Sequence, residues 1–394
     1  MKITGQKYFG WIILLFFLSC QKPYLPKVSS VNYQYLVVDG VINSGIDSTI
    51  IKLSRTVRLN QAAGHPESGA FVTIENEKNH KYFLTETTPG TYSVANLNLP
   101  TDSKYRLHIF TAANKEYVSD FVENKITPPI DSVGHRITKS GVEFYVDTHD
   151  AAAKTHYYRW EYDESWTYFT PMYSNLLYED SQVLFRTPDQ LVNFCYRHAV
   201  PANNIILGSS DKLSQDVIFQ MPVGFVTAVS GKLKHVYSAL IKQYAVTADA
   251  YKFWQLMKKN SEQLGSVFDN FPSSSIGNLH AVDNDPSDIV IGYISVSTVT
   301  SKRVFLQGRD LPFALPEYQG VDFPQTCDGG FIPLKPDYSL AYRLERTLGS
   351  GDSLLTIAQT DKNTGKITGY FYAVNKCVDC RLLGGTTVKP AYWP

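Results

Sequence analysis

Apolar and polar residues alternate along much of the first third of the chain. Successive side chains of a β-strand point to opposite faces, so this alternation predicts strands with one buried face. The pattern is clearest at Tyr105, Leu107 and Ile109, and it recurs in short segments separated by Gly, Pro, Asn and Asp. We expect seven strands, over 35–42, 49–57, 70–75, 81–85, 91–97, 104–111 and 116–122. Short strands in this order are typical of a β-sandwich of the immunoglobulin-like or carboxypeptidase-regulatory type.

The motif Thr127-Pro128-Pro129 interrupts the alternation. Proline disfavours helix for the residue before it and cannot donate to the ladder of a central strand. We therefore predict a domain boundary here, with a β-sandwich domain over 33–129 and a larger β-rich domain over 130–394. In the second domain, strand signals lie at 141–146, 155–162 and 165–170. Two strand pairs are expected, 289–299 with 302–306 and 354–359 with 366–374.

One segment of the second domain, 247–264, has helical periodicity instead. Ala250, Phe253, Trp254 and Met257 fall on one face, and lysine, glutamine and glutamate side chains fall on the other. Thr247 can cap the start of the helix, and a glycine follows its end. We expect one main amphipathic helix that packs on a sheet.

The N-terminus predicts export and a lipid anchor. Lys2 and Lys7 form a basic start, residues 10–18 (GWIILLFFL) are apolar, and Ser19-Cys20 follows directly. A bilayer takes about 20 apolar residues to cross, so this shorter stretch predicts a cleavable signal peptide over 1–19. We expect lipid on Cys20, a tether over 20–32 and a location on the outer membrane, with an ordinary secretory signal as the alternative.

Four cysteines follow the signal: Cys195, Cys327, Cys377 and Cys380. In an oxidising compartment an even number predicts two disulfides, and all three pairings remain open. Cys377 and Cys380 have the CxxC spacing of redox and zinc sites, but they follow a strand-like apolar run, and there is no second close pair. We expect structural disulfides, with a redox pair or a zinc site as the alternatives.

Composition and motifs exclude several functions. The chain has 37 basic and 37 acidic residues, and this neutral balance argues against nucleic acid as a partner. It contains no GxSxG, Walker A, GxGxxG or HExxH motif, and its nine histidines are scattered. We therefore expect no catalytic site, no cofactor and no bound metal. Asp283, Asp285 and Asp288 form an acidic loop whose alternate carboxylates suit calcium, but it lacks the glycine and terminal glutamate of an EF-hand, so we expect a solvated turn.

The best candidate for ligand binding is the aromatic segment 157–169 (YYRWEYDESWTYF). Tyr158, Trp160 and Tyr162 alternate, so they share one face of a strand, and charged residues share the other. If the aromatic face is exposed, it is a stacking platform for sugar rings or another flat ligand. If it is buried, it belongs to the core, which is the preferred interpretation because aromatic side chains gain much from burial.

Several phrases together resemble a known family. They are YLVVDGVI at 35–42, YKFWQLMKKNSEQLGSVFD at 251–269, GNLH and IVIGYISVS between 277 and 297, and CVDCRLLGG with KPAYWP at the end. They are similar to the Bacteroidota lipoproteins of domain of unknown function 4249, over nearly the whole mature chain. The resemblance implies an outer-membrane lipoprotein, often encoded near TonB-dependent receptors, with no established enzymatic activity.

These observations favour a non-enzymatic protein. We expect an accessory lipoprotein that captures a ligand or docks on a TonB-dependent outer-membrane receptor, held to the membrane through its N-terminal lipid. A surface adhesin or glycan-binding module is the alternative.

Overall fold

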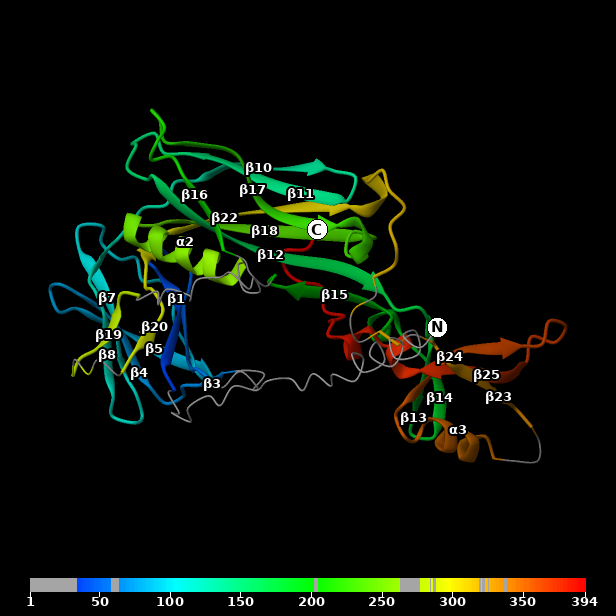
Figure 1. Ribbon diagram of the computed structural model, residues 1–394. Coiled ribbons are helices and arrows are strands. Elements are labelled where there is room, and N and C mark those ends of the chain that lie inside the picture. Colours follow the sequence, from blue (N-terminus) through cyan, green and yellow to red (C-terminus); the bar gives the residue numbers. More distant parts are fainter. Residues whose placement is uncertain are drawn as a thin grey trace, which may run out of the picture. The chain divides into compact units, whose positions relative to one another are not determined.

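The computed structural model describes residues 34–57, 64–201, 205–262, 277–283, 285, 288–318, 320, 323–324, 326–335 and 339–394. Residues 35–394 form one compact unit. It is mainly β, as predicted, and its strands gather into three groups (Figure 1).

All seven strands predicted for the first third are present, within three residues of the expected ends. Two short strands, β3 and β9, add to them. The first group consists of β1 (Leu36–Asn43), β2 (Thr49–Arg55), β3 (His65–Pro66), β4 (Phe71–Asn76), β5 (Lys81–Thr88), β6 (Thr91–Val94), β7 (Lys104–Phe110), β8 (Glu116–Ser119) and β9 (Val122–Glu123).

The first group folds over itself because β5 changes partner half-way along. Its first half pairs with β4, up to Leu84, and its second half pairs with β6, from Thr85 onward. The two halves of the sheet share one core, which contains Ile51 from β2 as well as Ile74 and Leu107 from β4 and β7. This arrangement is that of the predicted sandwich.

A later segment completes the first group. Strands β19 (Leu279–Ala281), β20 (Val290–Ile291) and β21 (Val296–Ser297) pair with β8 and β1 at opposite ends of the strand order. The Asn278 side chain joins the two ends, since its amide group both donates to and accepts from the backbone of Ile294, at 3.0 and 2.8 Å. The sequence assigned these strands to the segment 130–394, and the structure pairs them with strands of 33–129.

The second group is a pair of packed sheets. One sheet has the order β10-β11-β17, and the other has the order β15-β12-β18-β22 with β16 also on β12. Their inner faces share a single aromatic core. The strands are β10 (Ile130–Ile137), β11 (Gly141–His149), β12 (Tyr157–Phe169), β15 (Phe194–Ala199), β16 (Ile206–Ser209), β17 (Val217–Thr227), β18 (Val236–Ala245) and β22 (Val299–Gln307).

Two predictions for this group were wrong. The signals at 155–162 and 165–170 belong to one strand, β12, because the whole length of it pairs with neighbours. The segments 289–299 and 302–306 do not pair with each other, since β22 pairs with β18. Val290, Ile294 and Val296 are instead buried in the core of the first group. The segment 289–299 therefore packs on the first group and does not form a hairpin with β22.

The predicted helix is α2 (Ala248–Glu262), and it packs on β12 and β16. Thr247 caps it as predicted, because its Oγ1 accepts a hydrogen bond from the Ala250 amide at 3.2 Å. The sequence missed a second, shorter helix, α3 (Leu340–Leu348), which buries Leu344 in the third group.

The third group contains a hairpin and a small sheet. The sheet has the order β23-β25-β24, and its strands β24 and β25 are the pair predicted over 354–374. The elements are β13 (Leu176–Glu179), β14 (Gln182–Phe185), β23 (Gly329–Pro333), β24 (Ser353–Thr360) and β25 (Ile367–Val374). Two short 3-10 turns, Asn375–Cys377 and Cys380–Leu383, follow β25.

A buried carboxylate stabilises the first group. Glu75 on β4 has a side chain that is 5% exposed, and it contacts Lys81 at 2.7 Å, Arg106 at 2.8 Å and His108 at 2.8 Å. Burial by itself raises the pKa of this carboxyl, but the hydrogen bonds from His108, Lys81 and Arg106 outweigh burial and lower the pKa to about 2.

We predict that this network makes folding sensitive to acid. A carboxyl whose folded pKa lies below its unfolded value of 4.5 contributes stability above pH 4.5, and this contribution is lost as the pH falls toward 2. Between pH 6 and pH 3 the free energy of unfolding is expected to fall by about 2 kcal/mol more in the native protein than in Glu75→Gln. Urea titrations at both pH values measure the difference, and equal losses would contradict the assignment.

Candidate functional site

The aromatic face of β12 is buried. Tyr158 and Trp160 are 0% exposed and Tyr162 is 3% exposed. Trp160 Nε1 donates to Gln243 Oε1 at 2.8 Å, in the middle of the second group's core. A stacking platform needs an exposed face, so these three residues are not a ligand site, and the core interpretation of the sequence holds.

The opposite face of the same strand is charged. Arg159, Glu161 and Asp163 alternate with the buried aromatic residues, so they point away from the core. Cross-strand pairing places Tyr244 of β18 beside Arg159, and Lys242 beside Glu161. Five polar side chains from two adjacent strands therefore form one surface.

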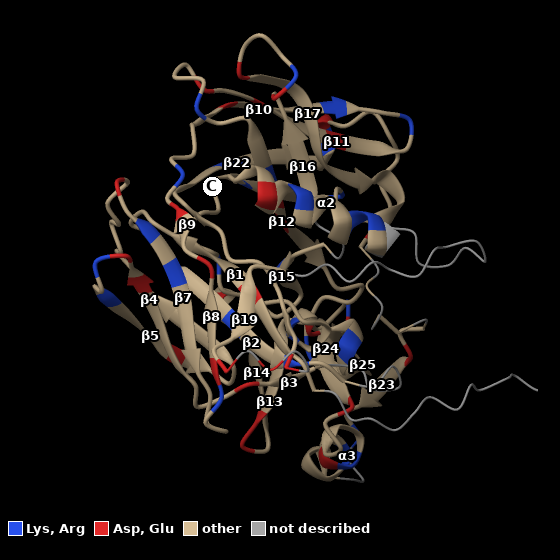
Figure 2. Ribbon diagram, turned by 60° about the vertical axis from the view of Figure 1, so that its left-hand side comes forward, with Lys and Arg blue, Asp and Glu red and all other residues tan. Residues whose placement is uncertain are grey.

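This surface is the floor of a cleft with a volume of 590 Å³. Strands β1 and β2 form the opposite wall, and β1 lies beside β12 and α2 in both views of the chain (Figures 1 and 2). Asp39 and Lys52 are cross-strand neighbours on that wall. Both are exposed, and neither forms an ion pair within the described part of the chain. The apolar residues of the lining are Val41, Ile50, Val200 and Val299.

At one end of the floor lies a buried arginine. Arg159 is 8% exposed, and its Nη2 contacts Glu161 Oε1 at 2.7 Å. The guanidinium lies 4.2 Å from the ring centroid of Trp254, a residue of α2, in a cation–π contact. Tyr244 donates its hydroxyl to the other Glu161 oxygen at 2.7 Å, and burial together with the Glu161 charge raises the Tyr244 pKa. The phenol therefore stays a donor.

At the other end lies a second ion pair. Lys242 Nζ contacts Asp163 Oδ2 at 2.9 Å, and His198 Nε2 lies 4.0 Å from the same oxygen. Asp163 itself is 9% exposed. The floor of the cleft thus carries two ion pairs, each with one buried member, Arg159 in the first and Asp163 in the second.

A second cavity, of 680 Å³, lies at the C-terminal end of β12. Its wall is aromatic and includes Phe169, Tyr318 and Phe323. Much of this wall comes from the stretch 317–327, in which positions 319, 321, 322 and 325 are outside the described residues. The cleft over β12 and β18 is bounded by strands along its length, and we take it as the candidate site.

The four cysteines form two disulfides, as predicted. Cys195 pairs with Cys380, and Cys327 pairs with Cys377. The two members of the CxxC motif are therefore bonded to different partners, and both are 0% exposed. This pairing is structural, and it does not provide the adjacent dithiol that a redox CxxC motif uses.

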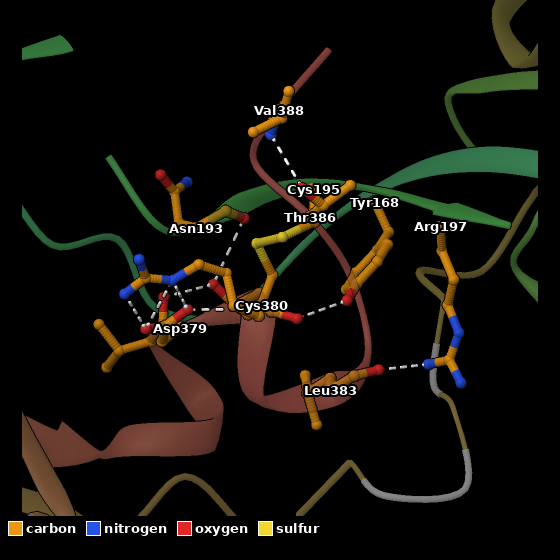
Figure 3. The surroundings of a disulfide bond; sticks show 12 residues. Tyr168, Asn193, Cys195, Arg197, Asp379, Cys380, Leu383, Thr386 and Val388 are labelled. Carbon is orange, nitrogen blue, oxygen red and sulfur yellow. Dashed lines mark hydrogen bonds and ion pairs between the residues drawn. A yellow bond between two sulfur atoms is a disulfide. The ribbon is translucent and has the colours of Figure 1, made fainter. Parts of the chain in front are cut away.

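The disulfide to β15 holds the C-terminal segment on the second group (Figure 3). Tyr168, at the end of the buried aromatic row, donates its hydroxyl to the Cys380 carbonyl at 2.7 Å. Arg197 of β15 donates to the Leu383 carbonyl. Further along the segment, Tyr392 stacks on Arg303 of β22 at 3.7 Å. Tyr392 also hydrogen-bonds to the Ser165 hydroxyl of β12 at 3.0 Å, so the segment contacts both β12 and β22.

The acidic loop is held by a lysine. Lys115 Nζ contacts Asp283 at 3.1 Å and Asp288 at 3.2 Å, and Tyr117 also donates to Asp288. Lys115 lowers the pKa of Asp283, as a neighbouring cation does. Over the described ranges, no three His, Cys, Asp or Glu side chains are grouped so that they could hold a metal ion.

Cys20 and the tether 20–32 lie outside the described residues. Of the helices that are described, none has the length and apolar character needed to span a bilayer.

The candidate cleft uses the strand that the sequence singled out, but the charged face of it rather than the aromatic face. The sequence does contain a signal for the charged face, namely the alternation of Arg159, Glu161 and Asp163. Three charged residues on one face of a strand are stable there only with partners of opposite charge or contact with water. No pattern in the sequence links them to Asp39 and Lys52, because those residues lie more than a hundred positions away on another group of strands.

Comparison with known proteins gives a family but no activity. None of the curated proteins matches the sequence. A solved structure described as complete manganese lipoxygenase of Gaeumannomyces graminis and partial zonadhesin of Komagataella pastoris is similar at 9% identity, covering 56% of this chain and 91% of that one. The TM-score is 0.16, a likeness too weak to indicate a shared fold. The family model described as Domain of unknown function (DUF4249) matches residues 21–303, and the chain belongs to that family.

Proposed function

We propose that this protein is a non-enzymatic outer-membrane lipoprotein that captures a small polar ligand in the cleft between β1–β2 and β12–β18. In this proposal it acts as an accessory subunit of a TonB-dependent transport system. The observation that carries the proposal is the cleft itself, a 590 Å³ cavity whose floor holds two ion pairs, each with one buried member. Ligand cavities in proteins have volumes of about 300–1,000 Å³.

The chemistry of the cleft supports binding rather than catalysis. Glu161 accepts from both Arg159 and Tyr244, and Asp163 is paired with Lys242. Carboxylates fixed in this way are acceptors with a set orientation. A general base or a nucleophile is instead held next to a partner that takes or gives its proton. Fixed donors and acceptors serve recognition of a ligand.

The location of the protein is inferred from its sequence. The signal-like residues 1–19, the cysteine at position 20 and the resemblance to lipoproteins found with TonB-dependent receptors all support an anchored envelope protein. The cleft residues and the anchor are separated by a tether, so capture and anchoring are assigned to different parts of the chain. The alternative of an adhesin that binds glycans through Tyr158, Trp160 and Tyr162 has lost its support, because these side chains are buried.

Copurification tests the proposed partner. We expect the tagged, lipid-anchored protein, extracted from its native outer membrane in mild detergent, to bring with it a TonB-dependent barrel in near-equal amount, identified by mass spectrometry. Cys20→Ala is the matched control, since loss of the lipid should leave the protein soluble and reduce recovery of the barrel. Recovery of the anchored protein as a lone monomer would refute docking.

A further inference from the structure

We infer that the cleft binds a neutral, polyhydroxylated ligand, a monosaccharide or short oligosaccharide. This inference rests on the proposed capture function and names the class of ligand that the same site takes. It follows from the charge balance of the lining, from the hydrogen-bonding capacity that the ion pairs leave unused, and from the apolar residues at the mouth.

The charges of the lining nearly cancel. The cations are Arg159, Lys242 and Lys52, and the anions are Glu161, Asp163, Asp39 and Asp47, with His198 beside them. The shielded charges on the floor already have opposite charges within 3 Å. An ionic ligand would have to compete with these pairs, and separating two charges that are partly shielded from water is unfavourable. A neutral ligand leaves both pairs intact.

The ion pairs still have unused donors and acceptors. An ionised carboxylate offers about four lone-pair sites, and a lysine ammonium offers three donors. The contact between Asp163 Oδ2 and Lys242 Nζ uses one lone-pair site of the carboxylate and one donor of the ammonium. Glu161 accepts hydrogen bonds from Arg159 and Tyr244 among the described residues, so about two of its lone-pair sites remain for a ligand. A hydroxyl both donates and accepts, so one hydroxyl can bridge the two members of an ion pair.

The mouth of the cleft adds an apolar surface. Ile50 is 48% exposed and Val200 is 57% exposed, and both line the cavity. A pyranose ring has hydroxyl groups around its edge and C–H groups on its faces. Such a ring can direct its hydroxyls to Glu161, Lys242 and Asp163 while a face packs against aliphatic side chains. A free amino acid carries a full positive and a full negative charge, and these would compete with the ion pairs of the floor.

The test is a binding screen of the full-length protein in detergent against three sets of probes. These are neutral mono- to tetrasaccharides, sugar acids, and free amino acids with dipeptides. We expect saturable binding of at least one neutral saccharide by isothermal titration calorimetry. The affinity should fall by more than tenfold in Glu161→Gln, which keeps the shape of the side chain but removes its charge and one acceptor. The exposed Glu179→Gln on β13 is the matched control and should bind as the native protein does.

A second variant keeps the test valid if Glu161→Gln fails to fold. Lys52→Gln changes an exposed residue of the wall that has no ion-pair partner among the described residues, so the fold should be unaffected and affinity should fall severalfold. Binding of sugar acids or amino acids alone, lost in the same variants, would overturn the ligand class and leave capture in the cleft standing. Saccharide binding that is unchanged in both variants, or no binding by any probe, would overturn the inference.

Discussion

Replacement of both Cys195 and Cys380 by alanine is expected to lower the free energy of unfolding by about 5 kcal/mol. The disulfide joins residues 185 positions apart, so its loss frees a very long loop in the unfolded chain. In the folded protein it ties the C-terminal segment to β15, next to the Tyr168 hydrogen bond to the Cys380 carbonyl. Urea unfolding followed by tryptophan fluorescence measures the loss.

The second disulfide provides the comparison. Cys327 and Cys377 are 50 positions apart, and the same loop-entropy relation gives about 4 kcal/mol for their removal. Removal of the disulfide with the longer separation should therefore lower the free energy of unfolding more. A loss below about 2 kcal/mol for Cys195 with Cys380, or the reverse order of the two variants, would show that chain entropy does not govern these bridges.

Replacement of Trp160 by alanine is also expected to lower the free energy of unfolding by about 5 kcal/mol. Loss of a fully buried tryptophan costs about 3–5 kcal/mol through lost contacts and the cavity left behind. The variant also orphans the Gln243 carbonyl oxygen, which accepts from Trp160 Nε1, and an unsatisfied buried acceptor costs about 1–3 kcal/mol. Gln243 itself is held by Pro128 and Thr148, so it cannot turn to find another donor.

The same variant separates the two interpretations of the aromatic segment. Phe169→Ala, at the 41% exposed end of β12, is the matched control and should cost about 1 kcal/mol. If Trp160→Ala instead kept its stability and lost only ligand binding, Trp160 would be a binding residue rather than part of the core. Equilibrium unfolding and ligand binding measured on the same samples distinguish the outcomes.

The β-rich fold was predictable because alternation is a local property of the sequence. Tyr105, Leu107 and Ile109 alternate with polar residues, and the strand they predict is β7. The helix over 247–264 was predictable for the same reason, since its apolar face and its cap lie within one window. The short helix α3 offers only nine residues, too few for periodicity to identify it.

Features that join distant segments were not predictable from local patterns. The spacing of four cysteines allows three pairings, and only the folded chain places Cys195 of β15 beside Cys380. Val290 and Ile294 look like part of a hairpin with β22 but fill the core of the first group. The cleft likewise needs β1 and β12 side by side, and the sequence separates them by more than a hundred residues.

The most direct test of capture in the cleft is to identify the small molecules that the protein holds when it is purified gently from its native membrane. The native protein and the double variant Lys52→Gln, Glu161→Gln would be denatured, and the molecules released would be compared by mass spectrometry. Our account predicts a polar small molecule, in near-stoichiometric amount, that the native protein releases and the variant does not. The same molecules released in the same amounts from both proteins would contradict it.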